Sequence, residues 1–319
     1  MRKIVIFMMI LSVIFSCDRK DLLEEEIAQI EMEVQVDRFD VEFSKATPED
    51  LPQLKSAYPF LFPSQYKDSV WIVKMKDTVQ REIFEEVARV FPDFSEPTEE
   101  LRSLFQHIKY YFPEFKEPRV ITLTSEVEYK NRVIWADSLL LLSLDVYLGT
   151  DHRFYERLPQ YQKKNFTAGQ IVSDVASDYV VKRIPPDQDR SFLGAMIRAG
   201  KELYLKDLLI PFKNDASRIG YTVEEMDWTR ANESEMWRYF VERSLLFSTD
   251  SRLKSRFIEP APFSKFYLEI DNESPGGVGR FIGWRIVRAY MHNNNVSLQD
   301  MLKTSAEDIF NKSGYKPKK

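Results

Sequence analysis

One predicted helix carries two carboxylates at a spacing that could support chemistry. In the segment Ala168–Arg183, Asp174, Asp178 and Lys182 recur every four residues, so their side chains lie in a row on one helix face. Two neighbouring carboxylates could hold a hard cation, or one could act as a base if the other raised its pKa. The alternative is a solvated face with an Asp-to-Lys pair. The opposite face of this helix is apolar and predicted to be core: Ile171, Val175 and Tyr179.

A glycine-rich segment is the second candidate site. Residues Ser274–Arg285 hold four of the ten glycines and lead into a predicted helix that reaches about His292. Exposed backbone N–H groups at that helix start, together with Arg280, could bind an anion. Arg285 and Arg288 extend the basic character along the helix, which suits a phosphate or an acidic partner; the alternative is a solvated amphipathic helix. The spacing G-x-G-x-x-x-G excludes a dinucleotide-binding fingerprint.

A third segment looks like a phosphate loop only superficially. In Gly194–Glu202 the glycine spacing is one residue too long, and Glu202 stands where a hydroxyl should ligate magnesium. The surrounding pattern predicts one continuous helix that ends at Pro211. Gly200 inside it costs about 1 kcal/mol relative to alanine, so we expect it to permit a close helix crossing.

Missing motifs exclude the common catalytic centres. The three histidines, His107, His152 and His292, lie far apart in the sequence, and there is no HExxH motif and no cysteine placed as a metal ligand. No G-x-S-x-G motif surrounds a serine, so a nucleophile elbow is not expected. His152 follows a predicted strand end and is the one histidine considered as a catalytic candidate. We therefore expect no enzyme, no catalytic residues, no metal and no cofactor.

The first residues form a predicted export signal. Residues 1–16 carry Arg2 and Lys3 and then an apolar run, the pattern of a secretory signal peptide. Cys17, the only cysteine, follows a small residue as in a bacterial lipobox, so it is the expected lipid attachment site. Residues 17–30 would then be the lipidated cysteine and an acidic tether; the alternative for the tether is the first helical turn of the globular part.

Composition points to a soluble globular body on this anchor. The formal charge is -5 and falls to -7 once the two cations of the leader are left out, which argues against a nucleic-acid partner. With 44% hydrophobic and 30% charged residues the chain can build a sizeable core. We expect a single globular domain over residues 31–319.

The secondary structure that must position these side chains is predicted to contain both strands and helices in the first half of the chain, and helices without strands in the second half. Alternation over Val34–Phe43 predicts a strand pair or a bulged strand, and helices are expected at Thr47–Tyr58, 78–91 and 98–112. Three further strands are predicted, and the last, apolar on both faces, should be central in its sheet: Val120–Leu123, Arg132–Trp135 and Leu139–Leu144. From Thr167 onward only helices and loops are expected. The fold class is therefore α+β, predominantly helical with one small sheet.

Together these landmarks resemble the gliding-motility lipoprotein GldB family. After the lipobox cysteine and the acidic tether come IVSDVASDYVVKRIP, GKELYLKDLLIP, SPGGVGRFIGWRIVRAYM and NVSLQDML, in this order. The resemblance implies a lipid-anchored envelope protein that acts alongside the gliding and secretion machinery. It supplies no catalytic residues, and only Cys17 takes over a role from it.

A second resemblance is to zinc peptidase-like families. Strands followed by the helix Ala168–Arg183 are similar to the arrangement in which the active helix carries HExxH. Here the corresponding pentad is Asp174-Val175-Ala176-Ser177-Asp178, which lacks both metal histidines and the glutamate base. This resemblance implies a degenerate, zincin-like scaffold without its chemistry.

The expected function is a non-enzymatic anchoring or assembly role in the gliding and secretion machinery of the bacterial cell envelope, with the membrane reached through Cys17 and other proteins as partners. Two alternatives stay open. One is an envelope hydrolase with an unrecognised site that uses Asp174, Asp178 or His152. The other is a polyanion- or peptidoglycan-binding lipoprotein that uses Arg280, Arg285 and Arg288.

Overall fold

The computed structural model describes residues 22–186, 189–269 and 271–318. The predicted signal peptide, Cys17 and the start of the tether lie outside these residues. Residues 22–28 are helical and bury Ile27. Gln106 donates hydrogen bonds to the carbonyls of Ala28 and Ile30. The described part of the acidic segment is thus packed on the body.

A four-stranded mixed sheet lies in the first half of the chain. Its order is β1 (Val36–Asp37), β2 (Arg119–Leu123), β4 (Leu139–Ser143) and β3 (Val133–Ala136). The pairs β1–β2 and β2–β4 are parallel, whereas β3 pairs antiparallel with β4. The three strands predicted between residues 120 and 144 are confirmed, and the last of them is central because it lies between β2 and β3.

The leucine run in β4 is apolar because both faces of the strand are covered. Leu140 and Leu142 are fully buried in the larger hydrophobic core. Leu139 and Leu141 pack instead on a smaller aromatic core on the other face. A strand with two covered faces needs no polar alternation.

The predicted strand over Val34–Phe43 is wrong for most of its length. Only Val36–Asp37 pairs with the sheet, and α2 (Phe39–Lys45) follows immediately. Phe39 and Phe43 are four residues apart, which places both on one helix face, and their rings lie 5.4 Å apart between centroids. The spacing of these apolar residues agrees with a bulged strand as well as with a helix. Their packing on the smaller core favours the helix.

The other helices of the first half follow the sequence pattern. The predicted helix at Thr47 begins with a capping box between Thr47 and Asp50, and continues as α3 (Leu51–Ala57). The helices predicted at 78–91 and 98–112 are confirmed as α5 (Thr78–Val90) and α6 (Ser95–Tyr111). Between them and α3 lies α4 (Asp68–Lys76).

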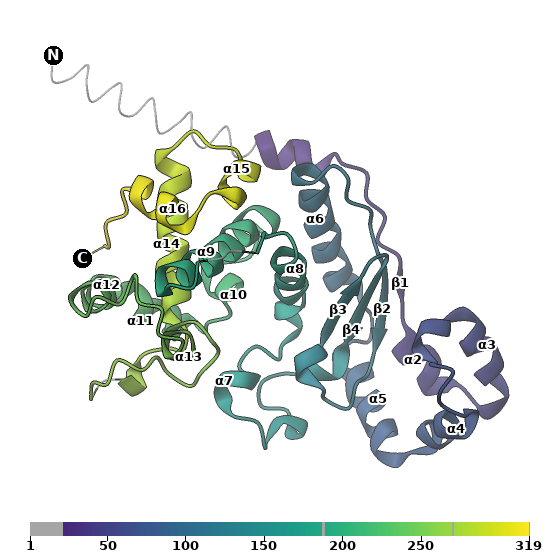
Figure 1. Ribbon diagram of the computed structural model, residues 1–319. Coiled ribbons are helices and arrows are strands. Elements are labelled where there is room, and N and C mark those ends of the chain that lie inside the picture. Colours follow the sequence, from purple (N-terminus) through teal and green to yellow (C-terminus); the bar gives the residue numbers. More distant parts are fainter. Residues whose placement is uncertain (1–21, 187–188, 270, 319) are drawn as a thin grey trace, which may run out of the picture.

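The second half is helical, as predicted. Its long helices are α8 (Ile171–Val181), α9 (Phe192–Leu209) and α14 (Val278–Asn293). The shorter ones are α7 (Gln160–Lys163), α10 (Asp215–Ile219), α11 (Val223–Ala231), α12 (Glu233–Glu242), α13 (Arg252–Phe257), α15 (Leu298–Lys303) and α16 (Ala306–Ser313). Figure 1 shows the sheet between the α2–α4 lobe on one side and α8, α9 and α14 on the other. Within the described ranges, no helix is both long and apolar enough to cross a bilayer.

Helices α9 and α14 cross at their glycines. A Cβ on Gly200 would lie 2.3 Å from the carbonyl oxygen of Gly283, and a Cβ on Gly283 would lie 1.8 Å from that of Met196. Only hydrogen fits at both positions, so the backbones approach closely. The prediction that Gly200 permits a helix crossing is confirmed.

Candidate functional site

The two carboxylates of α8 have separate partners. Asp174 accepts a 2.6 Å hydrogen bond from Arg132 Nε and a 3.0 Å bond from the Tyr147 hydroxyl. Asp178 accepts a 2.6 Å bond from Lys182, which also donates to the carbonyl of Trp135. The row of charges therefore contains the expected Asp-to-Lys pair at Asp178. Among the described residues no three His, Cys, Asp or Glu side chains gather to hold a metal ion.

The Asp174–Arg132 ion pair is largely shielded from solvent, since the two side chains are 12% and 26% exposed. Burial by itself lowers the pKa of Arg132, but the charge and hydrogen bond of Asp174 outweigh it and raise that pKa above its usual range. Burial, and then the charge of Asp174, raises the pKa of the Tyr147 hydroxyl. The sequence did not reveal these partners, because they lie 42 and 27 residues away along the chain.

A buried lysine lies behind the same helix face. Lys206 of α9 is 4% exposed and donates a 3.0 Å hydrogen bond to the Ser177 hydroxyl. Burial lowers the pKa of Lys206 to about 7, although the charge of Asp174 opposes the shift. This lysine was not predicted as a site residue, although its position among the buried apolar residues of α9 could have indicated it.

The Ser177–Lys206 contact has the distance of a nucleophile and its base. However, Ser177 lies in the middle of α8, where the backbone N–H groups are used within the helix. Its hydroxyl also donates a 2.9 Å bond back to the carbonyl of Ser173. An acyl-transfer site needs free donors for the oxyanion, so this geometry favours a structural contact.

The three arginines predicted as a basic site have different surroundings. Arg288 forms a bidentate 2.6 Å pair with Asp207 of α9 and also reaches Asp215 of α10. Arg285 donates to Glu233 at 3.3 Å. Both side chains are 24% exposed, so their charge is largely neutralised inside the protein. Within the described part of the chain, Arg280 has no side-chain hydrogen bond or ion pair recorded.

The start of α14 is not the exposed anion site that the sequence predicted. Val278 and Gly279 are buried, and the Val278 N–H donates to the Ser264 hydroxyl at 3.2 Å. The segment before α14 covers this end, since a Cβ on Gly276 would lie 2.1 Å from the carbonyl oxygen of Ala261. The glycines serve close packing, which glycine-rich sequence alone does not distinguish from ligand binding.

Arg280 faces a cleft of about 740 Å³ between α9, α13 and α14. Arg198 and Glu202, one turn apart on α9, lie on its wall with their charged groups 3.7 Å apart. Burial raises the pKa of Glu202, and the charges of Arg280 and Arg198 counteract this. The cleft also carries Lys254, so it combines cations with a partly buried carboxylate.

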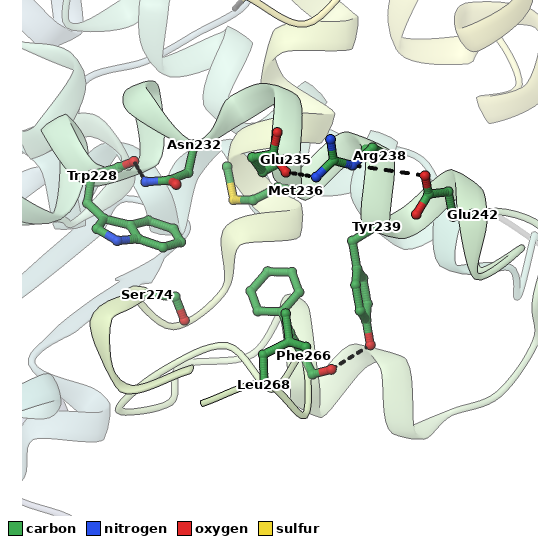
Figure 2. A pocket seen from close by; sticks show the side chains of 10 residues that line it. All are labelled: Trp228, Asn232, Glu235, Met236, Arg238, Tyr239, Glu242, Phe266, Leu268 and Ser274. Atoms are coloured by element: carbon green, nitrogen blue, oxygen red, sulfur yellow. Dashed lines mark hydrogen bonds and ion pairs between the residues drawn. The ribbon is translucent and has the colours of Figure 1, made fainter. Parts of the chain in front are cut away.

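A smaller apolar pocket of about 190 Å³ lies between α11, α12 and the loop before α14. Figure 2 shows Trp228, Met236 and Phe266 around it, with Tyr239 donating a 2.7 Å hydrogen bond to the Phe266 carbonyl. On its rim Arg238 pairs with two glutamates of α12, Glu235 and Glu242. The sequence offered no signal for this pocket, because its walls come from separate segments.

Two of the three histidines, His107 and His152, make local contacts. His152 Nδ1 accepts a 3.3 Å hydrogen bond from the N–H of Phe154, and its Nε2 lies 3.4 Å from Glu86. His107 lies 3.2 Å from Glu24 and 2.7 Å from the Ser103 carbonyl. Within the described residues, neither of these histidines bonds to Asp174 or Asp178.

A family model described as gliding motility protein GldB matches residues 20–317, nearly the whole chain. The chain belongs to the GldB family. No curated protein and no solved structure matches it.

The segments that carry the GldB resemblance are in contact in the fold. IVSDVASDYVVKRIP forms α8, GKELYLKDLLIP forms the second half of α9, and SPGGVGRFIGWRIVRAYM leads into and forms α14. Helix α9 packs against both α8 and α14. The GldB-like sequence therefore builds one interior unit, with Lys206 on its α8 side and the Arg288 ion pairs on its α14 side.

Proposed function

We propose that this GldB-family chain is a lipid-anchored component of the cell envelope that anchors or assembles gliding and secretion proteins and performs no catalysis. The observation that carries the proposal is the family match over residues 20–317. The charged groups of α8 and α14 support it, because most of them hold other parts of the same chain. Cys17 would attach the lipid.

Several acyl chains on Cys17 would hold the protein firmly on a membrane, since each buried methylene contributes about 0.8 kcal/mol. The body begins within a few residues of the cysteine, because helical structure is already present at residue 22. Its described N-terminal face would therefore lie close to the membrane, and the rest of the surface would be available to protein partners.

Complementation of a gene deletion in the native host tests the proposal. Cys17→Ala should lose surface spreading, because the body is no longer held at the membrane. Ser177→Ala and Asp178→Asn should keep spreading, because the proposal needs no nucleophile or carboxylate. Spreading, protein secretion and the amount of the protein are measured together.

A matched control separates the anchor from the cysteine itself. Replacing residues 1–17 by the signal and cysteine of an unrelated lipoprotein should restore spreading. Normal spreading in the deletion strain would contradict the gliding role, and loss of spreading in Ser177→Ala at normal protein levels would contradict the non-catalytic role.

We also propose that the scaffold is zinc-peptidase-like without the chemistry. In support, α8 packs beside the antiparallel edge strand β3, and the pentad Asp174–Asp178 lies on α8. Its first and fifth residues, at the positions of the two metal histidines, are paired with Arg132 and Lys182. Two cations at these positions disfavour a bound zinc ion, and zinc retained by the purified chain would contradict this view.

A further inference from the structure

The cleft of about 740 Å³ lies between α9, α13 and α14, three helices that pack together in Figure 1. Its volume is within the range of small-molecule sites in proteins, which is roughly 300–1,000 Å³. Part of its wall is apolar and consists of Ala195, Ala199, Ile258 and Pro260. Charged side chains form most of the rest. The cleft therefore has both the apolar surface and the polar groups that a small ligand requires.

Arg280 offers an unpaired guanidinium to this cleft. It lies in the first turn of α14 and is partly exposed. Among the described residues its side chain makes no hydrogen bond and no ion pair, whereas Arg285 and Arg288 on the same helix are both paired. A guanidinium has five N–H donors in a planar fork that matches a carboxylate. Arg280 can therefore bind an anionic group from outside the chain.

The loop before α14 holds the Arg280 side chain in place. Gly277 has a φ of 74°, and a Cβ there would lie 3.5 Å from Cδ of Arg280. The backbone N–H of Arg280 donates a 3.0 Å hydrogen bond to the Gly277 carbonyl. The side-chain stem thus packs on the glycine backbone. A side chain that is already ordered loses less entropy when it binds a ligand.

Glu202 is a carboxylate on the same cleft wall with few partners. Its side chain is 25% exposed, and within the described residues its one ion pair is with Arg198, at 3.7 Å. No hydrogen bond to the Glu202 carboxylate is formed within that part of the chain. Burial raises the pKa of Glu202, and the charge of Arg280 counteracts this, so the two groups interact without forming an ion pair. Glu202 can therefore accept a hydrogen bond from a ligand.

The charged residues that line the cleft are balanced. Three are cations and three are carboxylates: Arg198, Lys254 and Arg280, and Asp189, Glu202 and Glu259. Such a set has no net charge that would concentrate a polyanion. A ligand with a single charge would leave either Arg280 or Glu202 without a partner. A ligand with one anionic and one cationic group would satisfy both.

We propose that this cleft binds the zwitterionic group of an α-amino acid. The ligand carboxylate would accept hydrogen bonds from Arg280, and the ligand ammonium would donate to Glu202. The rest of the ligand would lie along Ala195, Ala199 and Ile258. Two sources present this pair of charges: a free amino acid, and the amino-acid end of a larger molecule. This binding would be an activity in addition to the proposed anchoring role and does not depend on it.

The test measures affinities by calorimetry with the full chain in detergent micelles. The probes are L-leucine, a free amino acid, and Nε-acetyl-L-lysine, which carries the zwitterion at the end of a longer chain. Tighter binding of Nε-acetyl-L-lysine would indicate a larger natural ligand, and equal or tighter binding of L-leucine a free amino acid. N-Acetyl-L-leucine lacks the ammonium and L-leucinamide lacks the carboxylate. Each should bind about tenfold more weakly than L-leucine, because one charge-assisted contact is lost.

Arg280→Met and Glu202→Gln should each weaken the binding of both probes about tenfold, for the same reason. Arg252→Met is the matched control, because Arg252 lies on α13 but is 82% exposed and does not line the cleft. Its affinity should equal that of the wild type, and an unchanged thermal unfolding midpoint shows that each variant is folded.

Three results would overturn the proposal. The first is no saturable binding of either probe up to about 10 mM, a concentration at which even a millimolar site is mostly occupied. The second is equal binding of L-leucine and its two blocked analogues. The third is wild-type affinity in both Arg280→Met and Glu202→Gln.

Discussion

Lys206 shows how burial controls a single ionisable group in this fold. Its ammonium lies between α8 and α9 with one neutral hydroxyl as hydrogen-bond partner. Burial lowers its pKa from the usual 10.5 to about 7. Because the folded pKa lies below the unfolded one, the unfolded chain binds more protons between these two pH values. The free energy of unfolding therefore rises with pH across that window.

This linkage predicts the behaviour of Lys206→Met. The wild type should gain stability relative to the variant as the pH rises from about 7 to 9, by up to about 1 kcal/mol per pH unit. Urea unfolding of the wild type and the variant at several pH values measures the difference between their free energies of unfolding. The other ionisable groups are common to both proteins, so their contributions cancel in this difference. Lys254→Met, at an exposed lysine, should run parallel to the wild type. Parallel curves for Lys206→Met would contradict the buried state of this lysine.

At the scale of elements, the crossing of α9 and α14 is the contact with the least room for change. Gly283→Ala would drive its Cβ into the Met196 backbone carbonyl, so the helices would have to move apart. We expect a loss of about 3 kcal/mol or more, at the upper end of overpacking effects. Gly169→Ala is the control, because a Cβ there meets nothing within 4 Å. Chemical denaturation compares the two, and equal stabilities would contradict the close crossing.

The elements also show what sequence reasoning can reach. The apolar stripe of α8 and the leucines of β4 were predictable, because the pattern of apolar residues within each segment is enough to indicate its secondary structure and its buried faces. Phe39 and Phe43 were assigned to the wrong element, since their spacing suits a bulged strand as well as a helix, and only the rings of the smaller core decide. The partner of Asp174 was out of reach, because Arg132 comes from a strand region 42 residues earlier. The glycines before α14 were considered as a possible anion site for a similar reason, since the segment packed against them is not visible in local spacing.

At the scale of the whole molecule, the described chain has two hydrophobic cores of unequal size. The larger runs from Ile83 to Ile309 and includes both the sheet and the α9–α14 crossing. The smaller holds eight buried residues, four of them from α2, α3 and α4, on the far face of the sheet. Figure 1 shows these helices as a lobe at one side of the molecule. A single domain over residues 31–319 remains a prediction, and the lobe is the part that could open separately.

Hydrogen exchange should therefore divide the molecule. Amides of α3 and α4 should exchange faster than those of α9 and α14, because a lobe with a small core can unfold locally. Phe62→Ala, which removes a ring that is 6% exposed, should accelerate exchange in the lobe and leave α9 and α14 unchanged. Phe60→Ala is the matched control, since that ring is 38% exposed, and it should alter exchange little. If Phe62→Ala accelerated exchange equally in α9 and α14, the two cores would unfold as one cooperative unit, and the lobe would have no separate stability.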